Sequence, residues 1–374
     1  MTEPAGRRLR WTTTCAIAVL AMDLAGAQPI ANPGDVAGLE LITSFEGHGD
    51  VMRVRWNAHG SLLAVASSDS AVRIWTSPGG ELAATLRGHG SHVYDVDWNE
   101  DGSLLASAAC NDRDATGLHC VAGGIIVWDV KSQSLVRQLS FPHHPHAVST
   151  RMEQKEGKAD VIDPHSQPGA EVRAVAWSKN GRSLAIGNAA GAVRIWDTAT
   201  WQLTHEATPH WQITDMAWSP DGRLAIAARD NTITVWDRSG TRLTQVLKQH
   251  SLDIYAIDWH ATMPLLASAG GDRTVVIWNV DRDEIVRTLS EFDGSVHSVA
   301  WHPGGRHLAV TAYTPARGAA EILVYDTENW RVIARAVGDD GRIFRSLAWS
   351  SDGSVLASGG TDYIVTLWRF DAGE

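Results

Sequence analysis

The densest group of potential metal ligands in the sequence lies in one segment between residues 142 and 171. It contains five side chains of the kinds that bind transition metals: His143, His144, His146, Asp163 and His165. They could share an ion only if the segment folded back on itself, and their spacing matches no firm metal-site pattern. The segment is also rich in Pro, Lys, Glu and Gly, which is typical of a solvated loop. We therefore predict no metal site and no cofactor.

Catalytic motifs are missing from the sequence. It contains no metalloprotease, phosphate-loop, dinucleotide-binding or nucleophile-elbow motif. Glycine-rich pieces such as Ala269-Gly270-Gly271-Asp272 occur in the same turn of the repeats described below, so a backbone turn that needs glycine explains them. The sequence therefore predicts a protein that is not an enzyme. A hydrolase or lyase is the least favoured alternative.

Two cysteines, Cys110 and Cys120, are the only ones outside the N-terminal region. In an oxidising compartment a disulfide between them is expected, and in the cytoplasm they would be free thiols. The state of these cysteines therefore depends on where the protein is located.

The N-terminal region has the order expected of a secretory signal peptide. Arg7, Arg8 and Arg10 precede an apolar run from Trp11 to Met22, and Ala25-Gly26-Ala27 follows. We predict that the protein is exported to the periplasm or the extracellular space. A cytoplasmic protein with a disordered leader is the alternative. No other segment has the roughly 18 apolar residues of a membrane-spanning helix, so the body is not expected to be embedded in a membrane.

Tryptophan is unusually frequent, with 17 residues against five Phe and five Tyr, and it is regularly spaced. One series follows short alternating apolar stretches: Trp56, Trp98, Trp177, Trp218, Trp259, Trp301 and Trp349. A second series closes a strand similar to VRIWD: Trp75, Trp128, Trp196, Trp236, Trp278, Tyr325 and Trp368. Because the two series alternate strictly, the chain contains seven repeats.

The repeat has a period of about 42 residues and contains β-strand and turn signals. Turn-like segments such as SPDGR (219–223) follow the first aromatic, and Asp-Gly suits a tight hairpin. Three places depart from the period and hold insertions: 111–124, 142–171 and 314–320. Four short strands per repeat predict an all-β fold of seven blades, each buried only by stacking on its neighbours.

The repeats resemble the WD-repeat (WD40) β-propeller family. Gly47-His48 and Gly88-His89 resemble its GH signature, and Trp128-Asp129, Trp196-Asp197 and Trp236-Asp237 resemble its WD signature. The resemblance implies a propeller of four-stranded antiparallel blades, whose ring is closed by an N-terminal strand within LELITSFEGH (39–48) that completes the last blade. We assign residues 1–27 to the leader, 28–37 to a linker and 38–371 to the propeller.

The resemblance also assigns structural roles. In the family a His, a Ser, an Asp and the Trp of one blade are joined by hydrogen bonds, and the fifth repeat has all four: His250, Ser268, Asp272 and Trp278. The third and sixth repeats have Ala190 and Ala319 in place of the Asp, which predicts weaker blades there.

By the strand order of the family, all three insertions open on one face of the disc, opposite the Asp-Gly turns. Each inner strand has one position that should lie at a bulge near the channel mouth on that face: Met52, Tyr94, Arg173, Thr214, Tyr255, His297 and Arg345. Tyr, Arg and His supply much of the binding energy of protein interfaces. We predict that these residues bind a partner together with Asp95 and Asp215, and that Trp211 is a further exposed contact. The alternative is that they are ordinary exposed strand residues.

The predicted function is a non-catalytic scaffold, monomeric within a complex, that binds a protein or peptide on the face with the inserted loops. A net charge of −11, from 32 basic and 43 acidic residues, disfavours nucleic acid as a partner. The second hypothesis is a cell-envelope sensor of a small molecule or glycan that uses the channel mouth.

Overall fold

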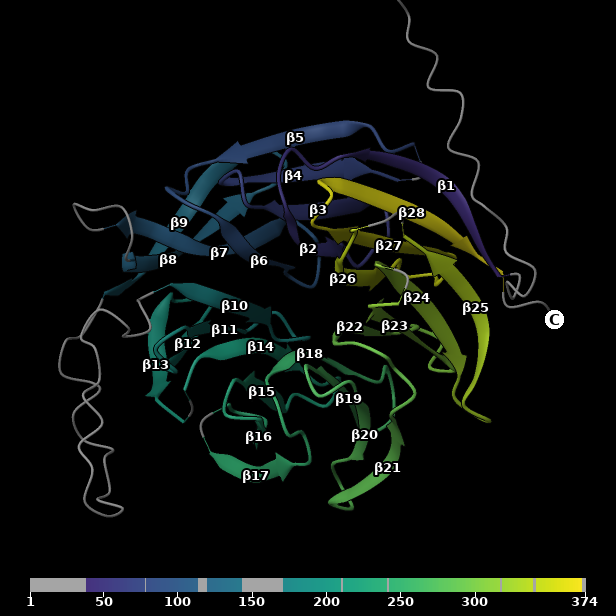
Figure 1. Cartoon of the computed structure of the whole chain (residues 1–374). Coiled ribbons are helices and arrows are strands. Elements are labelled where there is room, and N and C mark those ends of the chain that lie inside the picture. Colours follow the sequence, from purple (N-terminus) through teal and green to yellow (C-terminus); the bar gives the residue numbers. More distant parts are fainter. Residues whose placement is uncertain are drawn as a thin grey trace, which may run out of the picture. The chain divides into compact units, whose positions relative to one another are not determined.

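A computed structural model describes residues 38–77, 79–113, 120–142, 171–209, 211–240, 242–316, 318–338 and 341–371. Within these residues the chain forms seven four-stranded antiparallel sheets arranged around a central channel, as predicted (Figure 1). The described part contains no helix long and apolar enough to span a membrane.

The strands of the first four blades follow the chain from the inner to the outer edge of each blade. Blade one comprises β2 (Val51–Trp56), β3 (Leu62–Ser67), β4 (Ala71–Thr76) and β5 (Leu82–Arg87). Blade two comprises β6 (Val93–Trp98), β7 (Leu104–Arg113), β8 (Cys120–Asp129) and β9 (Ser134–Pro142). Blade three comprises β10 (Val172–Trp177), β11 (Ser183–Asn188), β12 (Val193–Asp197) and β13 (Gln202–Ala207). Blade four comprises β14 (Ile213–Trp218), β15 (Leu224–Ala228), β16 (Thr232–Trp236) and β17 (Leu243–Lys248).

The last three blades include the one that closes the ring. Blade five comprises β18 (Ile254–Trp259), β19 (Leu265–Gly270), β20 (Val275–Asn279) and β21 (Glu284–Leu289). Blade six comprises β22 (Val296–Trp301), β23 (His307–Thr314), β24 (Ala319–Asp326) and β25 (Arg331–Val337). Blade seven comprises β26 (Phe344–Trp349), β27 (Val355–Gly360), β28 (Ile364–Phe370) and, as its outer strand, β1 (Leu39–Glu46). The predicted closure is confirmed, because β1 pairs with β28 in register from Leu39 opposite Phe370 to Glu46 opposite Ile364.

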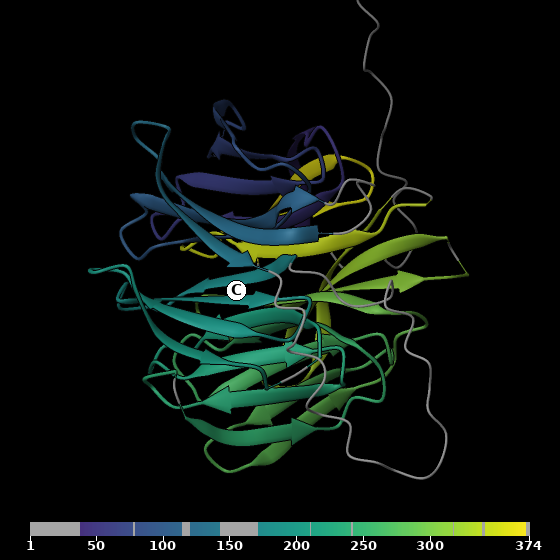
Figure 2. The same ribbon diagram turned by 90° about the vertical axis from the view of Figure 1, so that its left-hand side faces the viewer.

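The apolar core lies between blades. One cluster joins Val72 and Ile74 of blade one to Val96 and Trp98 of blade two, and comparable clusters join the other neighbours. In Figure 2 the strands of blade two, in blue, adjoin those of blade three, in teal. A blade cannot bury both of its faces alone, so burial of apolar surface requires the ring.

Five of the seven tryptophans of the first series tie neighbouring blades together by an indole hydrogen bond, whereas the indole N–H groups of Trp177 and Trp301 have no partner among the described residues. The indole N–H of Trp98 donates to the carbonyl of Arg55 at 3.0 Å, and that of Trp259 donates to the carbonyl of Ala217 at 3.0 Å. Trp56 makes the same contact with Ala348 at 3.1 Å, which links blade one to blade seven. These bonds satisfy a buried donor and fix the angle between blades, which explains why tryptophan is used at this position.

All seven inner strands contain a β-bulge at the predicted position. The register shifts between the first and the third residue of each strand, as between Val51 and Arg53 or between Val93 and Asp95, and the other five inner strands do the same. The second residue of each inner strand is therefore left unpaired, close to the start of the strand.

Two of the three insertions lengthen hairpins. Residues of the 111–124 segment extend β7 to Arg113 and begin β8 at Cys120, and the 314–320 segment continues β23 and β24. Both lie at the end of their blades where the inner strand begins, as does the junction of β9 with β10. Most of the 142–171 segment lies outside the described residues.

Candidate functional site

The seven bulged residues form a ring on the face that carries the inserted segments. We call this set the bulge ring: Met52, Tyr94, Arg173, Thr214, Tyr255, His297 and Arg345. Six of the seven are half-buried and Arg345 is exposed. Each comes from an inner strand, and the inner strands surround the channel (Figure 1). The structure thus brings all seven predicted positions to one channel mouth.

Neighbouring members of the bulge ring contact each other across blade boundaries. The guanidinium of Arg173 lies 5.0 Å from the centre of the Tyr94 ring and 2.7 Å from the carboxylate of Glu171. The rings of Tyr255 and His297 stack with their centres 5.3 Å apart. These contacts fix the side chains in place, so that little conformational entropy would be lost when a partner binds.

His297 is neutral at physiological pH. Burial lowers the pKa of its imidazole to about 4, and the nearby charge of Arg345 acts in the same direction. A neutral imidazole stacked on Tyr255 can donate or accept a hydrogen bond, but it does not add a positive charge to the ring.

Asp95 and Asp215 do not belong to the bulge ring, which corrects their predicted role as partner contacts. They are 1% and 0% exposed, and both bind Arg53, whose Nε and Nη2 lie 2.7 and 2.5 Å from their carboxylates. We call this triad the Arg53 clamp. The physical reason is the bulge: it turns the second residue of the strand outward and the third into the channel wall.

The Arg53 clamp connects three blades across the channel. Arg53 comes from blade one, Asp95 from blade two and Asp215 from blade four, and each carboxylate also accepts the backbone N–H of the next blade, from Val175 at 2.9 Å and Ile257 at 3.0 Å. Burial lowers the pKa of Arg53, but the two carboxylates outweigh it and raise the pKa above its usual value. Sequence reasoning missed Arg53; the signal was a single Arg at a position occupied elsewhere by Asp, Ser or Ala.

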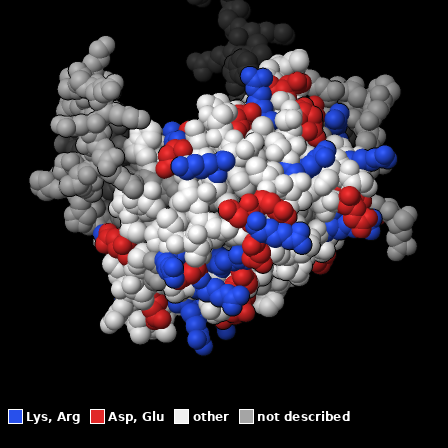
Figure 3. Space-filling model, turned by 90° about the horizontal axis from the view of Figure 1, so that it is seen from below, with Lys and Arg blue, Asp and Glu red and all other residues white. Residues whose placement is uncertain are grey.

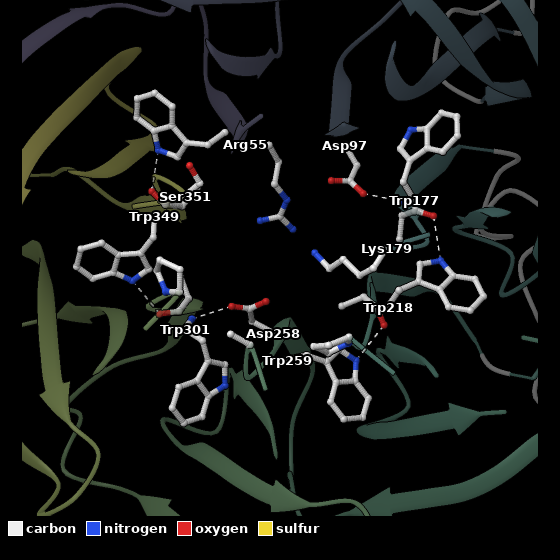
Figure 4. A pocket seen from close by; sticks show the side chains of 18 of the residues that line it. Arg55, Asp97, Trp177, Lys179, Trp218, Asp258, Trp259, Trp301, Trp349 and Ser351 are labelled. Atoms are coloured by element: carbon white, nitrogen blue, oxygen red, sulfur yellow. Dashed lines mark hydrogen bonds between the residues drawn. The ribbon is translucent and has the colours of Figure 1, made fainter. Parts of the chain in front are cut away.

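A second opening of the channel lies at the ends of the inner strands, by the Asp-Gly turns. It is a cavity of about 510 Å³, here called the channel cavity, and four charged residues line it: Arg55, Asp97, Lys179 and Asp258 (Figure 4). Burial raises the pKa of Asp97, and it raises the pKa of Asp258 to about 6. No motif predicts this cavity, because its residues are far apart in sequence.

The hydrogen-bonded set of blade five is present. His250 Nε2 lies 2.8 Å from Ser268 Oγ, His250 Nδ1 lies 3.0 Å from Asp272, and the Trp278 indole donates to Ser268 Oγ at 2.9 Å. These groups are bonded to one another within the blade and face neither opening, which agrees with a structural role.

The remaining predicted residues fall in separate places. Cys110 and Cys120 are both buried and are joined as a disulfide between β7 and β8, with their Cα atoms 5.8 Å apart. The bond requires oxidising conditions, and in a reducing cytoplasm the same two residues would be adjacent thiols. Trp211 is 56% exposed in the loop that leads into β14. The described residues hold no group of three metal-ligating side chains, and the five candidate ligands between His143 and His165 lie outside the described residues.

The rim of the disc carries charges of both signs. In the view of Figure 3, lysine and arginine side chains lie among aspartates and glutamates. Arg223, for example, lies 2.7 Å from Asp281 of the next blade. A rim of this kind lacks the continuous basic stripe of nucleic-acid-binding surfaces.

Comparison with known families agrees with the repeat pattern. The model described as "WD domain, G-beta repeat" matches six segments: 39–76, 80–116, 201–237, 241–279, 283–314 and 332–369. A model described as "Anaphase-promoting complex subunit 4 WD40 domain" matches residues 122–213, which hold the remaining blade. The chain belongs to the WD-repeat family of β-propeller proteins.

Similarity to individual proteins is more informative than the family match. Eukaryotic translation initiation factor 3 subunit I of Bombyx mori is 26% identical over 345 residues, covering 86% of this chain and 92% of the relative. The same subunit of Drosophila virilis is 25% identical over 358 residues, covering 88% of this chain and 97% of the relative. The same subunit of Candida albicans is 27% identical over 229 residues, covering 52% of this chain and 65% of the relative.

These relatives overturn the prediction of export. They are subunits of a translation initiation factor, and translation initiation takes place in the cytoplasm. The signal-peptide prediction depended on the order of a basic, an apolar and a small-residue segment. This order also occurs in proteins that are not secreted. Residues 1–27 lie outside the described residues.

Proposed function

We propose that this protein is a non-catalytic scaffold that binds a segment of a partner protein on the bulge ring. The observation that carries the proposal is the ring itself: seven bulged residues, rich in Tyr, Arg and His, at one channel mouth and held by contacts between blades. Such residues provide large contact area and directed hydrogen bonds at the centre of protein interfaces.

Unused hydrogen-bonding groups in the ring support the same proposal. The hydroxyl of Thr214 and the Nε of Arg173 are buried and have no hydrogen-bond partner among the described residues. A buried polar group without a partner costs about 1–3 kcal/mol. A bound peptide backbone that displaced the side chains covering these atoms could form hydrogen bonds with them, so binding would remove part of this cost.

The relatives suggest the setting in which the scaffold acts. They are named as subunits of translation initiation factor 3, a multi-subunit factor, and they align with nearly the whole propeller. We therefore propose that this chain is a cytoplasmic subunit of a protein assembly, and that its role is to hold other subunits in place.

The test compares two variants of the full chain. Tyr94→Ala, Arg173→Ala, Tyr255→Ala and Arg345→Ala together remove the large side chains of the bulge ring. Complexes are purified from native extract on each variant, and the partner is then mapped on the wild type by hydrogen exchange. We expect the amount of partner recovered with the ring variant to fall at least about tenfold, because truncating a central contact typically costs more than 1 kcal/mol of binding free energy.

A matched control removes exposed charge from the opposite face. Arg238→Ala and Arg282→Ala alter side chains that are 75% and 73% exposed in turns on the Asp-Gly side. This control should keep its partners and its melting temperature. If the ring variant is equally stable and retains the same partners, or if hydrogen exchange protects another surface, the proposal is wrong.

A further inference from the structure

The channel cavity lies on the face opposite the bulge ring. The Arg53 clamp, whose three side chains are at most 10% exposed, crosses the channel between the two openings. The cavity of about 510 Å³ is of the size of small-ligand sites, and Met216, Pro220 and Pro303 are among its apolar lining residues.

Two cationic side chains point into this space. Arg55, from β2, and Lys179, from the turn between β10 and β11, both extend toward the middle of the cavity in Figure 4. Neither side chain forms a hydrogen bond or an ion pair with any residue in the described ranges. Both cations act through space on the carboxylates of Asp97 and Asp258, where they oppose the rise in pKa caused by burial, but their own N–H donors have no partner in the described structure.

The two carboxylates of the cavity are already engaged. Asp97 accepts the backbone N–H of Trp177 at 2.8 Å, and Asp258 accepts that of Trp301 at 2.7 Å (Figure 4). Each is therefore held against the wall by the next blade, and neither forms an ion pair with Arg55 or Lys179 in the described structure. The acids offset the net charge of the cavity, but they leave the donors of the two cations unused.

We propose that the channel cavity binds a small anion, a free carboxylate or phosphate compound, between Arg55 and Lys179. The guanidinium and ammonium groups would donate charge-assisted hydrogen bonds to its oxygens. Because the cavity also holds the carboxylates of Asp97 and Asp258, its four charged groups balance before any ligand enters, and the site should favour an anion of low charge over a highly charged one such as a polyphosphate. The site is independent of the partner-binding function proposed for the opposite face.

The experiment titrates the full chain with sodium phosphate, sodium acetate and sodium succinate, with ionic strength held constant by sodium chloride. Binding is measured by calorimetry and by the rise in the unfolding temperature. A saturable response to phosphate alone, to the carboxylates alone, or to both identifies which oxyanion chemistry the site takes. Each of these results supports the proposal if the response is weaker in the Lys179→Met variant.

The variants are chosen so that loss of binding and loss of folding are distinguishable. Lys179 is an exposed turn residue, so Lys179→Met should fold normally, and we expect it to weaken anion binding about tenfold, the effect of one lost charge-assisted hydrogen bond. Lys179→Arg should retain most of the affinity. Arg182→Met, in the same turn but not among the cavity-lining residues, is the control and should bind as the wild type does.

Two results would overturn the proposal. One is the absence of any saturable response to the three anions beyond that of sodium chloride. The other is a response of equal strength in the wild type and in Lys179→Met, which would place the anion elsewhere. Arg55→Met is a second probe of the site, and its substitution leaves intact the backbone carbonyl that accepts the Trp98 indole.

Discussion

Removing the cation of the Arg53 clamp should destabilise the propeller strongly. In Arg53→Met, Asp95 and Asp215 would keep their backbone hydrogen bonds but lose the only guanidinium within ion-pair distance in the described structure. Breaking a buried ion pair by removing one partner typically costs about 3–5 kcal/mol, because an uncompensated buried charge remains. Here two carboxylates are left, so we expect a loss in the free energy of unfolding at the upper end of this range.

A compensated variant tests the cause of that loss. Blades six and seven have serine at the position of the two aspartates. Ser298 and Ser346 are uncharged, and each hydroxyl accepts the backbone N–H of the next blade at 3.1 Å. Arg53→Met with Asp95→Ser and Asp215→Ser keeps these acceptors and removes all buried charge. We expect the triple variant to recover most of the lost stability, since replacing a whole buried ion pair is often neutral.

The pH dependence gives an independent measure. Burial already raises the pKa of Asp95, and removing Arg53 takes away a charge that lowers it, so the folded state would bind more protons than the unfolded chain and stability would fall as pH rises through the folded pKa. Urea unfolding at pH 5 and pH 7 should therefore show a smaller defect of Arg53→Met at pH 5. The reasoning is refuted if Arg53→Met lies within about 1 kcal/mol of the wild type at pH 7, or if the triple variant is no more stable than the single one.

Three further predictions concern other parts of the propeller. Burial raises the pKa of Asp258 to about 6 from 3.8, so its carboxylate destabilises the fold increasingly as the pH rises from about 4 to 6 and fully above that. Asp258→Asn should therefore gain up to about 3 kcal/mol over the wild type at pH 8 in urea unfolding, and the gain should vanish near pH 4. A stability difference between Asp258→Asn and the wild type that stays the same from pH 4 to pH 8 would contradict this prediction. Ser268→Ala should cost about 2–3 kcal/mol, because both a His and a Trp bond to its hydroxyl, whereas Ser358→Ala, with the Trp alone, should cost about 1 kcal/mol; equal losses in thermal unfolding would argue against additive bonds. Cys110→Ser with Cys120→Ser should lower the stability of oxidised protein by about 2–3 kcal/mol and leave reduced protein much less affected, as measured after thiol titration; the same loss in both states would mean that packing matters rather than the bond.

The repeat pattern was sufficient to predict the fold, because each blade is specified by local features. Alternating apolar residues, Asp-Gly turns and the two aromatic series recur every 42 residues or so, and ring closure follows from the strand that precedes the first full repeat. The bulges were predicted as well, from the resemblance of the inner strands to those of the WD-repeat family, and the register shifts at the predicted position.

The charged interior of the channel was not predictable in the same way. Arg53 and Asp215 are 162 residues apart and meet only because the ring brings blades one and four to opposite walls of one channel. Asp95 and Asp215 were assigned to the surface because, counted along the strand, they follow ring residues directly. The bulge determines which neighbour faces solvent and which faces the wall, and that depends on geometry rather than on residue type.

The pairing of β1 with β28 has a consequence for the synthesis of the chain. Glu40 and Arg369, which form an ion pair across this ladder at 2.9 Å, are separated by 329 residues. At translation rates of about 5–20 residues per second, β1 leaves the ribosome between roughly 15 and 65 s before its partner exists. During that time a strand with unpaired N–H and C=O groups is available to any other strand. The newborn propeller is therefore an open ring until β28 has been synthesised, and until then its first strand needs a chaperone or its own charges to keep it from pairing with another strand.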